Sequence, residues 1–232
     1  MHSPKLSIIT INYNDAEGLE KTMDSVFGQT FRDYEYIIID GGSKDTSVQQ
    51  IEAHAPKITH WVSEKDDGVF HAQNKGIMAS TGEYLLFLNS GDVLDHANAL
   101  TEFISHQDFQ GDIIYGDYRF EDGEKVYADE LTPYYFVKTS LPHQSTLFRR
   151  TVFDTMGLYD EKYKIAADRA FFIKCFMSGK ISFQHIKYPL TLFDLSGLSN
   201  DPNFLEKKKE EDEALFKEYF GSEYENVMAQ RE

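Results

Sequence analysis

The segment Asn89-Ser90-Gly91-Asp92 places an amide and a carboxylate directly after a run of apolar residues. That run, Tyr84 to Leu88, has the character of a strand buried on both faces of a parallel sheet. In open α/β sheets, ligands bind at the carboxyl ends of the strands. A carboxylate there can hold a divalent cation against a phosphate, because hard cations take oxygen ligands. The segment therefore predicts a phosphate site with a bound cation.

A second carboxylate, Asp40, follows the apolar run Tyr36 to Ile39 and precedes two glycines. A dinucleotide site would need Gly-x-Gly-x-x-Gly after the first strand, and residues 12–18 lack it, which argues against NAD. A P-loop is also absent from the sequence. The remaining interpretation is a mononucleotide, with Tyr13 stacking on the base and Asp40 accepting from a base N–H. Asp40 as a helix cap is the alternative.

The composition narrows the class of ligand. Among 232 residues, 39 Asp and Glu against 23 Lys and Arg give a net charge of −16. This balance argues against sequence-independent nucleic-acid binding and against a broad grip on an anionic membrane. An anionic ligand such as a sugar nucleotide would need a bridging cation. The single cysteine, Cys175, excludes an intramolecular disulfide and a multi-cysteine zinc site, so we expect it to pack in the core.

The first half of the chain alternates predicted strands and helices. Strands are expected at Leu6–Asn12, Glu35–Asp40, Ile58–Val62 and Tyr84–Leu88, and helices at Ala16–Phe27, Thr46–His54 and Val69–Ala79. Asn14 or Asp15 is the expected N-cap of the first helix. Such alternation predicts βαβ units around a parallel sheet, which is an α/β fold.

The pattern loosens after Asp92. We expect helices at 97–106, 168–178 and 204–220, strands at 112–115, 181–188 and 190–194, and a hairpin over 118–127. In the last helix, Lys207-Lys208-Lys209 precedes Glu210-Glu211-Asp212-Glu213, which we interpret as a solvated face with i,i+4 pairs. No signal peptide or bilayer-length apolar run is found, so we expect a cytoplasmic protein, at most peripheral to the inner face of the membrane.

Five segments of the chain resemble those of family 2 glycosyltransferases. They are Ile-Thr-Ile-Asn-Tyr-Asn (9–14), Ile-Ile-Ile-Asp-Gly-Gly-Ser-Lys-Asp-Thr-Ser (37–47), Tyr-Leu-Leu-Phe-Leu-Asn-Ser-Gly-Asp (84–92), Gly-Leu-Tyr-Asp (157–160) and Ala-Ala-Asp-Arg (166–169). The resemblance implies a GT-A fold, a Rossmann-like fold with a central, mostly parallel sheet flanked by helices. It covers a domain at 1–200, with a nucleotide-binding half at 1–110 and an acceptor or catalytic half at 111–200, before a charged C-terminal helix at 201–232.

The resemblance also assigns residues to the donor. Tyr13, Asp15 and Asp40 would bind the base and ribose. Residues 66–74 match a donor-binding loop and helix start, from which we select Asp66, Asn74 and the adjacent Lys75. A solvated helix lysine is the alternative for Lys75.

The same resemblance assigns the chemistry. Asp92 would hold Mg²⁺ or Mn²⁺ on the diphosphate, with Asn89 and His143 as candidate further ligands. His143 could instead orient the acceptor or be structural. Asp168 is the candidate general base, which removes the proton of the acceptor hydroxyl as it attacks the anomeric carbon. Residues 196–199 resemble a loop that closes over the site, with an ordinary turn as the alternative.

Several positions depart from the family pattern. Asn89 and Gly91 replace the two aspartates of the usual Asp-x-Asp, which leaves Asp92 as the carboxylate of that segment. Gly41 replaces a second aspartate, Ala167 replaces a glutamate, and Gln73 lies where many relatives carry an arginine. Each change removes charge and keeps the central residues.

The sequence thus predicts a hexosyltransferase-type glycosyltransferase that moves a sugar with inversion from a nucleotide-diphosphate donor, with UDP expected, to a hydroxyl acceptor. The expected acceptor is a saccharide or lipid-linked saccharide in surface-polysaccharide biosynthesis, by analogy alone. A sugar-nucleotide-binding protein without catalysis and a nucleotidyltransferase are the alternatives. We expect no nucleic-acid partner, and self-association into a homo-oligomer stays open.

Overall fold

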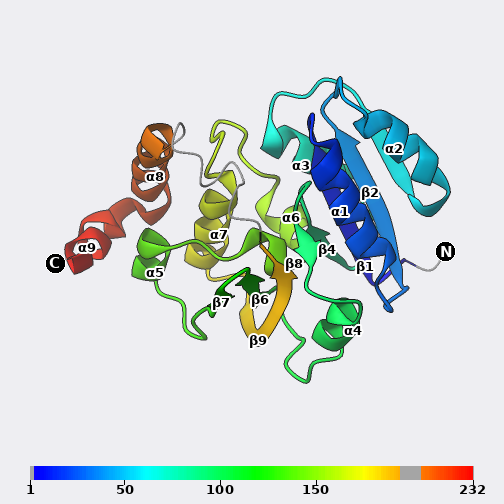
Figure 1. Cartoon of the computed structure of the whole chain (residues 1–232). Coiled ribbons are helices and arrows are strands. Elements are labelled where there is room, and N and C mark those ends of the chain that lie inside the picture. Colours follow the sequence, from blue (N-terminus) through cyan, green and yellow to red (C-terminus); the bar gives the residue numbers. More distant parts are fainter. Residues whose placement is uncertain (1–2, 194–204, 232) are drawn as a thin grey trace.

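The computed structural model describes residues 3–193 and 205–231 of the chain. Its centre is one sheet in the order β3-β2-β1-β4-β8-β6-β9-β5, with β7 paired to β6. In Figure 1 the N-terminal elements β1, β2, α1 and α2 lie at one end of the molecule, and α8 and α9 lie at the other. Within the described residues, no helix combines the length and apolar character needed to cross a membrane.

The first half is a parallel α/β unit, as predicted. Its elements are β1 (Leu6–Asn12), α1 (Ala16–Phe27), β2 (Tyr34–Asp40), α2 (Ser47–His54), β3 (His60–Ser63), α3 (Val69–Ala79) and β4 (Tyr84–Phe87). β1 pairs in parallel with both β2 and β4, and β2 pairs in parallel with β3. The bounds of β1, α1 and α3 match the prediction. The carboxyl ends of β1, β2 and β4 therefore lie at one edge of the sheet.

The second half mixes strand directions. Its elements are β5 (Val93–Leu94), α4 (Ala99–Ile104), β6 (Ile113–Phe120), β7 (Gly123–Lys125), α5 (Pro133–Lys138), β8 (Thr146–Arg149), α6 (Thr151–Met156), α7 (Ala167–Ser178), β9 (Phe183–Leu192), α8 (Leu205–Phe220) and α9 (Tyr224–Met228). β8 is antiparallel to both β4 and β6. The predicted hairpin forms between β6 and β7, with Phe120 opposite Gly123. α5 and α9 were not predicted.

The predicted division of this region into two strands, at 181–188 and 190–194, is wrong. One strand runs from Phe183 to Leu192, and its pairing with β6 is irregular on either side of Asp117, which lies opposite Pro189. Proline cannot donate to the strand ladder, so the chain bulges around it and then resumes pairing.

Two apolar cores cover the two faces of the sheet, because successive strand residues point to opposite sides. On β1, Ile8 packs in the cluster with Leu19 and Met23 of α1, whereas Ile9 packs in the cluster with Ile77 of α3. The second cluster also holds residues of α5 to α9, Cys175 among them. Cys175 is a buried free thiol, which confirms its expected place in the core.

A buried histidine joins β6 to β9. The Nε2 atom of His185 is 2.9 Å from Asp117 Oδ1, and its Nδ1 atom is 2.7 Å from Asp129 Oδ1. Both ring nitrogens face carboxylate oxygens, so the imidazole carries both protons when both contacts are hydrogen bonds. Burial disfavours the charged ring, but the two carboxylates outweigh burial and raise the pKa of His185 above 6.5.

This ion pair should make stability depend on pH. Its contribution is fully present below the unfolded histidine pKa of 6.5 and is lost as pH rises through the higher folded pKa. His185→Gln should therefore lower the free energy of unfolding by about 3 kcal/mol at pH 6 and by clearly less at pH 9, because it removes the cationic partner of the buried Asp117 carboxylate. Urea unfolding at both pH values measures this difference. His60→Gln, at an exposed position of β3, is the control, and an equal loss at both pH values for His185→Gln would contradict the account.

Candidate active site

A buried carboxylate organises the ends of β1 and β2. Asp40 is fully buried, and its Oδ1 accepts from Asn12 Nδ2 (2.7 Å) and Ser43 Oγ (2.5 Å). Its Oδ2 accepts from the backbone N–H groups of Gly42 and Ser43 and from Ser63 Oγ. Burial opposes ionisation, but the hydrogen bonds outweigh it and hold the pKa of Asp40 below its ordinary value.

These contacts change the interpretation of Asp40. Both carboxylate oxygens are already engaged, so a bond from a base N–H would have to replace one of them. Asp40 is also not the cap of α2, which begins after Thr46. Its carboxylate instead fixes the loop that follows β2.

The amide of Asn12 links that loop to the end of β4. Asn12 donates through Nδ2 to Asp40, and its Oδ1 accepts from Ser90 Oγ at 2.8 Å. The backbone N–H of Ser90 also donates to Ile11 O. The loop after β2 and the turn after β4 are therefore one hydrogen-bonded unit. Neither Asn12 nor Ser90 was selected as a site residue from the sequence.

An exposed ring and a carboxylate flank the backbone of Gly41. A Cβ atom on Gly41 would lie 2.6 Å from Asp66 Oδ2 and 3.2 Å from Tyr13 Cδ2. The Tyr13 side chain is 66% exposed, so its ring is open to a stacking partner. Asp66 accepts from Gly68 N through its other oxygen. Gly41 thus leaves room for the Asp66 carboxylate, which an aspartate at position 41 would displace.

Asp15 serves first as the N-cap of α1. Its Oδ1 accepts from Gly18 N at 3.0 Å, and the side chain is exposed. The preceding Asn14 has a φ of 53° and accepts from Lys44 N, which ties the loops after β1 and β2 together. Asp15 therefore holds the beginning of a helix beside these loops.

The two predicted donor contacts on α3 have partners within the protein. Asn74 is buried, its Nδ2 donates to Tyr159 O and Glu161 Oε1, and its Oδ1 accepts from Tyr159 N. Lys75 forms a 2.8 Å ion pair with Glu64, which is 57% exposed. Exchanging the exposed Glu64 for a phosphate costs little, whereas withdrawing the buried Asn74 amide would leave backbone groups unpaired.

The turn after β4 gathers oxygen ligands. Asp92 Oδ2 accepts from Asn89 N at 3.0 Å, and Asn89 Oδ1 accepts from Gln73 Nε2 at 3.2 Å. Gln73 is 1% exposed, and its Oε1 is buried without a hydrogen-bond partner. An amide oxygen is among the ligands that a hard cation takes. The sequence pattern indicates only that Gln73 lies where many relatives carry an arginine.

Protein side chains alone do not complete a metal coordination sphere at the turn after β4. Across residues 3–193 and 205–231, no group of three or more His, Cys, Asp or Glu side chains could hold a metal ion. Mg²⁺ commonly binds through one or two carboxylates together with substrate phosphates. The ligands around Asp92 therefore fit a cation that arrives with, or is completed by, a diphosphate.

His143 lies in an aromatic cluster between β4 and α7. Its ring stacks on Phe87 with centroids 4.8 Å apart, and its Nε2 lies 2.9 Å from the Tyr159 hydroxyl. Burial lowers the pKa of His143 to about 3, so the imidazole is neutral at pH 7. Because Nε2 contacts the Tyr159 hydroxyl, Nδ1 is the ring nitrogen that could contact a ligand.

Asp168 lies in the first turn of α7. Burial raises its pKa, although the Arg169 N–H and guanidinium oppose the shift. The Asp168 charge in turn raises the pKa of Tyr159, whose ring packs against Phe171 of α7 with the ring centroids 5.1 Å apart. A carboxylate with a raised pKa is a better proton acceptor than an ordinary one. The cluster Phe87–His143–Tyr159 thus connects the end of β4 to the neighbourhood of Asp168.

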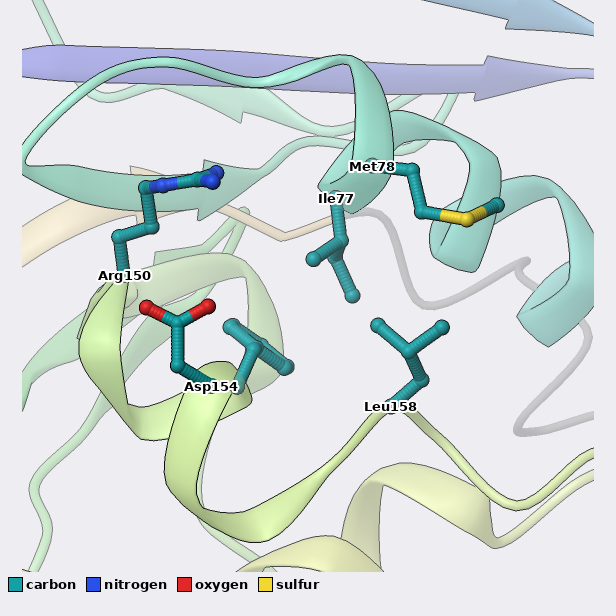
Figure 2. Close-up of a pocket in the computed structure, with 6 residues that line it drawn as sticks. Ile77, Met78, Arg150, Asp154 and Leu158 are labelled. Carbon is teal, nitrogen blue, oxygen red and sulfur yellow. The ribbon is translucent and has the colours of Figure 1, made fainter.

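A further pocket lies between α3 and the segment that contains α6. It has a volume of about 270 Å³ and is lined by Ile77, Met78, Arg150, Phe153, Asp154 and Leu158. Figure 2 shows Ile77 and Met78 of α3 on one side and Asp154 of α6 on the other. None of the predicted site residues lines this pocket. The predicted loop at 196–199 lies outside the described residues.

Comparison with known sequences identifies related proteins. A family model described as Glycosyl transferase family 2 matches residues 7–172. A PGL/p-HBAD biosynthesis glycosyltransferase of Mycobacterium bovis is 32% identical over 222 residues, covering 89% of this chain and 85% of the relative. An uncharacterized glycosyltransferase of Mycobacterium tuberculosis is 32% identical over 180 residues, covering 74% of this chain and 69% of the relative.

Solved structures share the fold. S. aureus TarS 1–349 in complex with UDP-GlcNAc matches with a TM-score of 0.73 at 17% identity, covering 97% of this chain and 71% of that one. This chain spans 42% of a longer TarS chain. The mannosyltransferase PcManGT from Pyrobaculum calidifontis, in complex with GDP-Man and Mn²⁺, matches 86% of this chain and 59% of that one at 16% identity, with a TM-score of 0.63. These likenesses confirm the predicted GT-A fold.

The neutral state of His143 can be observed directly. Because burial lowers its pKa to about 3, the ring signals of His143 should stay constant between pH 5 and pH 8 in NMR spectra. His143→Gln assigns those signals by removing them. His185, whose pKa is raised, should be protonated at the lower end of the same range and serves as the internal comparison. A His143 titration with a midpoint above pH 5 would contradict the described environment.

Proposed function

This chain belongs to glycosyl transferase family 2, and from that membership we propose that it transfers a sugar from a UDP-linked donor to a hydroxyl acceptor. The membership confirms the prediction of a glycosyltransferase. The observation that carries the donor proposal is the hydrogen-bonded series Asp40–Asn12–Ser90. It joins the loops beside Tyr13 to the turn that holds Asp92, so a base and a diphosphate could be bound at the same edge.

We assign the base to the space beside Gly41. The exposed Tyr13 ring offers a stacking face, and the Asp66 carboxylate can accept from an N–H on the edge of uracil. Asp40 contributes by holding the loop in place, and Asp15 by fixing the beginning of α1. Lys75 could exchange Glu64 for a donor phosphate.

We assign the diphosphate to the turn after β4. Asp92 and Asn89 would hold Mg²⁺ or Mn²⁺, and the Gln73 amide donates to Asn89 Oδ1. When bound, such a cation neutralises charge on the leaving nucleotide. The requirement for a cation also follows from the net charge of −16, which otherwise repels a diphosphate. His143, also predicted as a metal ligand, would contribute through Nδ1 because Tyr159 engages Nε2.

Asp168 is the proposed general base. It would remove the proton of the acceptor hydroxyl as that oxygen attacks the anomeric carbon. The oxygen attacks on the face opposite the diphosphate, so the configuration inverts as the bond from this carbon to the diphosphate breaks with its electron pair on the diphosphate oxygen. Burial raises the pKa of Asp168, which strengthens its carboxylate as a proton acceptor. The proposed acceptor is a saccharide or lipid-linked saccharide, as in surface-polysaccharide synthesis.

Nucleotide binding should depend on a cation and on Asp92. UDP with Mn²⁺ should raise the melting temperature of the protein more than UDP alone, because a ligand of the folded state stabilises it. Asp92→Asn keeps an oxygen for the Asn89 N–H but loses the charge, so the Mn²⁺-dependent affinity for UDP should fall by about 10- to 100-fold. Thermal shift assays and calorimetry measure both effects. Asp24→Asn, at an exposed position of α1, is the control. Equal UDP affinity with and without Mn²⁺ would contradict the role of the cation.

Turnover should depend on Asp168. UDP-GlcNAc is the first donor to be tested, followed by other UDP-sugars. Because the acceptor is unidentified, the assay measures the release of UDP when water takes the place of the acceptor hydroxyl. Asp168→Asn should lower turnover by about 10²- to 10⁴-fold, the usual contribution of a general base, while UDP affinity stays unchanged. Asp154→Asn, in the first turn of α6, is the matched control. Undiminished turnover in Asp168→Asn would contradict the proposed base.

A further inference from the structure

A carboxylate from α8 binds the backbone immediately before α7. Glu211 Oε1 accepts from Lys164 N at 2.8 Å, and its Oε2 accepts from Ile165 N at 2.9 Å and Ala166 N at 3.0 Å. Glu211 is 8% exposed. The interpretation of this helical segment as a solvated face is therefore wrong for Glu211, whose partners lie 45 to 47 residues away in the sequence.

Helix α7 has no cap of its own. Its N-cap position is Ala166, which forms no side-chain hydrogen bond, and Ala167 follows. The N-terminus of a helix carries unpaired N–H groups and partial positive charge, so it favours a carboxylate. Glu211 supplies that carboxylate from another helix. Asp168 lies two residues after Ala166, within the turn whose approach Glu211 holds.

The next residue of α8 fixes the other side of Asp168. Asp212 Oδ2 pairs with Arg169 Nη1 at 2.6 Å. Arg169 also donates to the backbone oxygens of Phe136 and Val137 on α5, and its guanidinium lies 5.0 Å from the centre of the Phe216 ring. The side chain that follows Asp168 is therefore held by both α5 and α8.

A third contact anchors the same loop. Glu218 of α8 accepts from Lys162 Nζ at 2.7 Å and from the Tyr163 hydroxyl at 2.8 Å. Leu215 and Phe216 of α8 are buried in the core that also contains Ala167 and Ala170. Acidic and apolar residues of α8 thus bind the chain from residue 162 to residue 169.

We propose that α8 positions the catalytic carboxylate: Glu211 fixes the backbone turn that carries Asp168, and Asp212 holds Arg169 beside it. This inference rests on the proposed role of Asp168 as the base. Glu211 and Asp212 are positioning residues, since they act on the reaction through the placement and charge environment of Asp168.

The proposal predicts a specific loss of turnover. In Glu211→Gln one carbonyl oxygen replaces two carboxylate oxygens, and the new amide NH₂ faces backbone donors. The turn should loosen and misplace Asp168, and a misplacement of about 1 Å can cost about 10²-fold in rate. We expect turnover of UDP-GlcNAc, or of whichever UDP-sugar is turned over fastest, to fall by about 10- to 100-fold. UDP affinity should stay within about twofold of that of the unmodified protein, because the contacts proposed for the uracil base and the diphosphate lie on other elements.

The proposal also predicts a shift in the pH profile. The charged and titratable groups near Asp168 are Tyr159, Arg169, Lys208 and Asp212. Asp212→Asn removes a negative charge and leaves the Arg169 charge less compensated, and both effects lower the pKa of Asp168. Because the base acts when deprotonated, the acid limb of the turnover profile should move to lower pH.

The experiment compares full-length variants by UDP release, UDP calorimetry and melting temperature. Glu210→Gln, the exposed neighbour on α8, is the matched control and should behave as the unmodified protein. The inference is overturned if Glu211→Gln turns over like Glu210→Gln, or if it loses UDP affinity and turnover together. If Glu211→Gln does not fold, Asp212→Asn decides: an unmoved acid limb overturns the inference.

Asp168→Asn in the same series separates the two claims. If Asp168→Asn keeps its turnover, the proposed base is wrong, whatever Glu211→Gln does. If Asp168→Asn loses turnover while Glu211→Gln keeps it, the proposed function stands and the positioning role of α8 fails.

Discussion

The hydrogen bonds of the Asn12 amide hold the site together. Asn12 donates to the buried Asp40 carboxylate and accepts from Ser90, so one side chain spans the ends of β2 and β4. Burying a carboxylate is costly unless its oxygens are paired, and Asp40 meets this condition with five hydrogen bonds. The need to pair the Asp40 oxygens fixes the loop around Gly41, which Tyr13 and Asp66 flank. The proposed donor site thus depends on satisfying one buried charge.

The second half of the site rests on a different kind of interaction. Phe87 continues from β4 into an aromatic cluster with His143 and Tyr159, and α7 packs against that cluster through Phe171. Burial keeps His143 neutral and raises the pKa of Asp168, so the same exclusion of water shifts the pKa of both groups. The N-terminus of α7 completes this half with a carboxylate taken from α8.

Local sequence patterns predicted the parallel half well because β1, β2 and β4 are largely apolar runs that are buried along nearly their whole length. The beginning of α1 at Ala16 follows from the Asp15 cap, which short-range chemistry specifies. Predictions from these patterns were wrong where contacts between residues far apart in the sequence determine the local structure. Glu211 and Asp212 look solvated by spacing, but partners more than 40 residues away in the sequence bury Glu211 and partly bury Asp212. Pro189 predicted a strand end, yet pairing with β6 carries β9 past it. No motif reveals that both Asp40 oxygens already accept hydrogen bonds or that the Gln73 oxygen has no partner, because both depend on tertiary contacts.

The central claim is that the nucleotide and its cation bind at the joined ends of β1, β2 and β4, and a crystal structure with UDP and Mn²⁺ tests it most directly. The account predicts uracil against the Tyr13 ring beside Asp66, and Mn²⁺ between the diphosphate and the Asp92 carboxylate. Nucleotide bound elsewhere, for example in the pocket between α3 and α6, with this edge of the sheet empty, would contradict it.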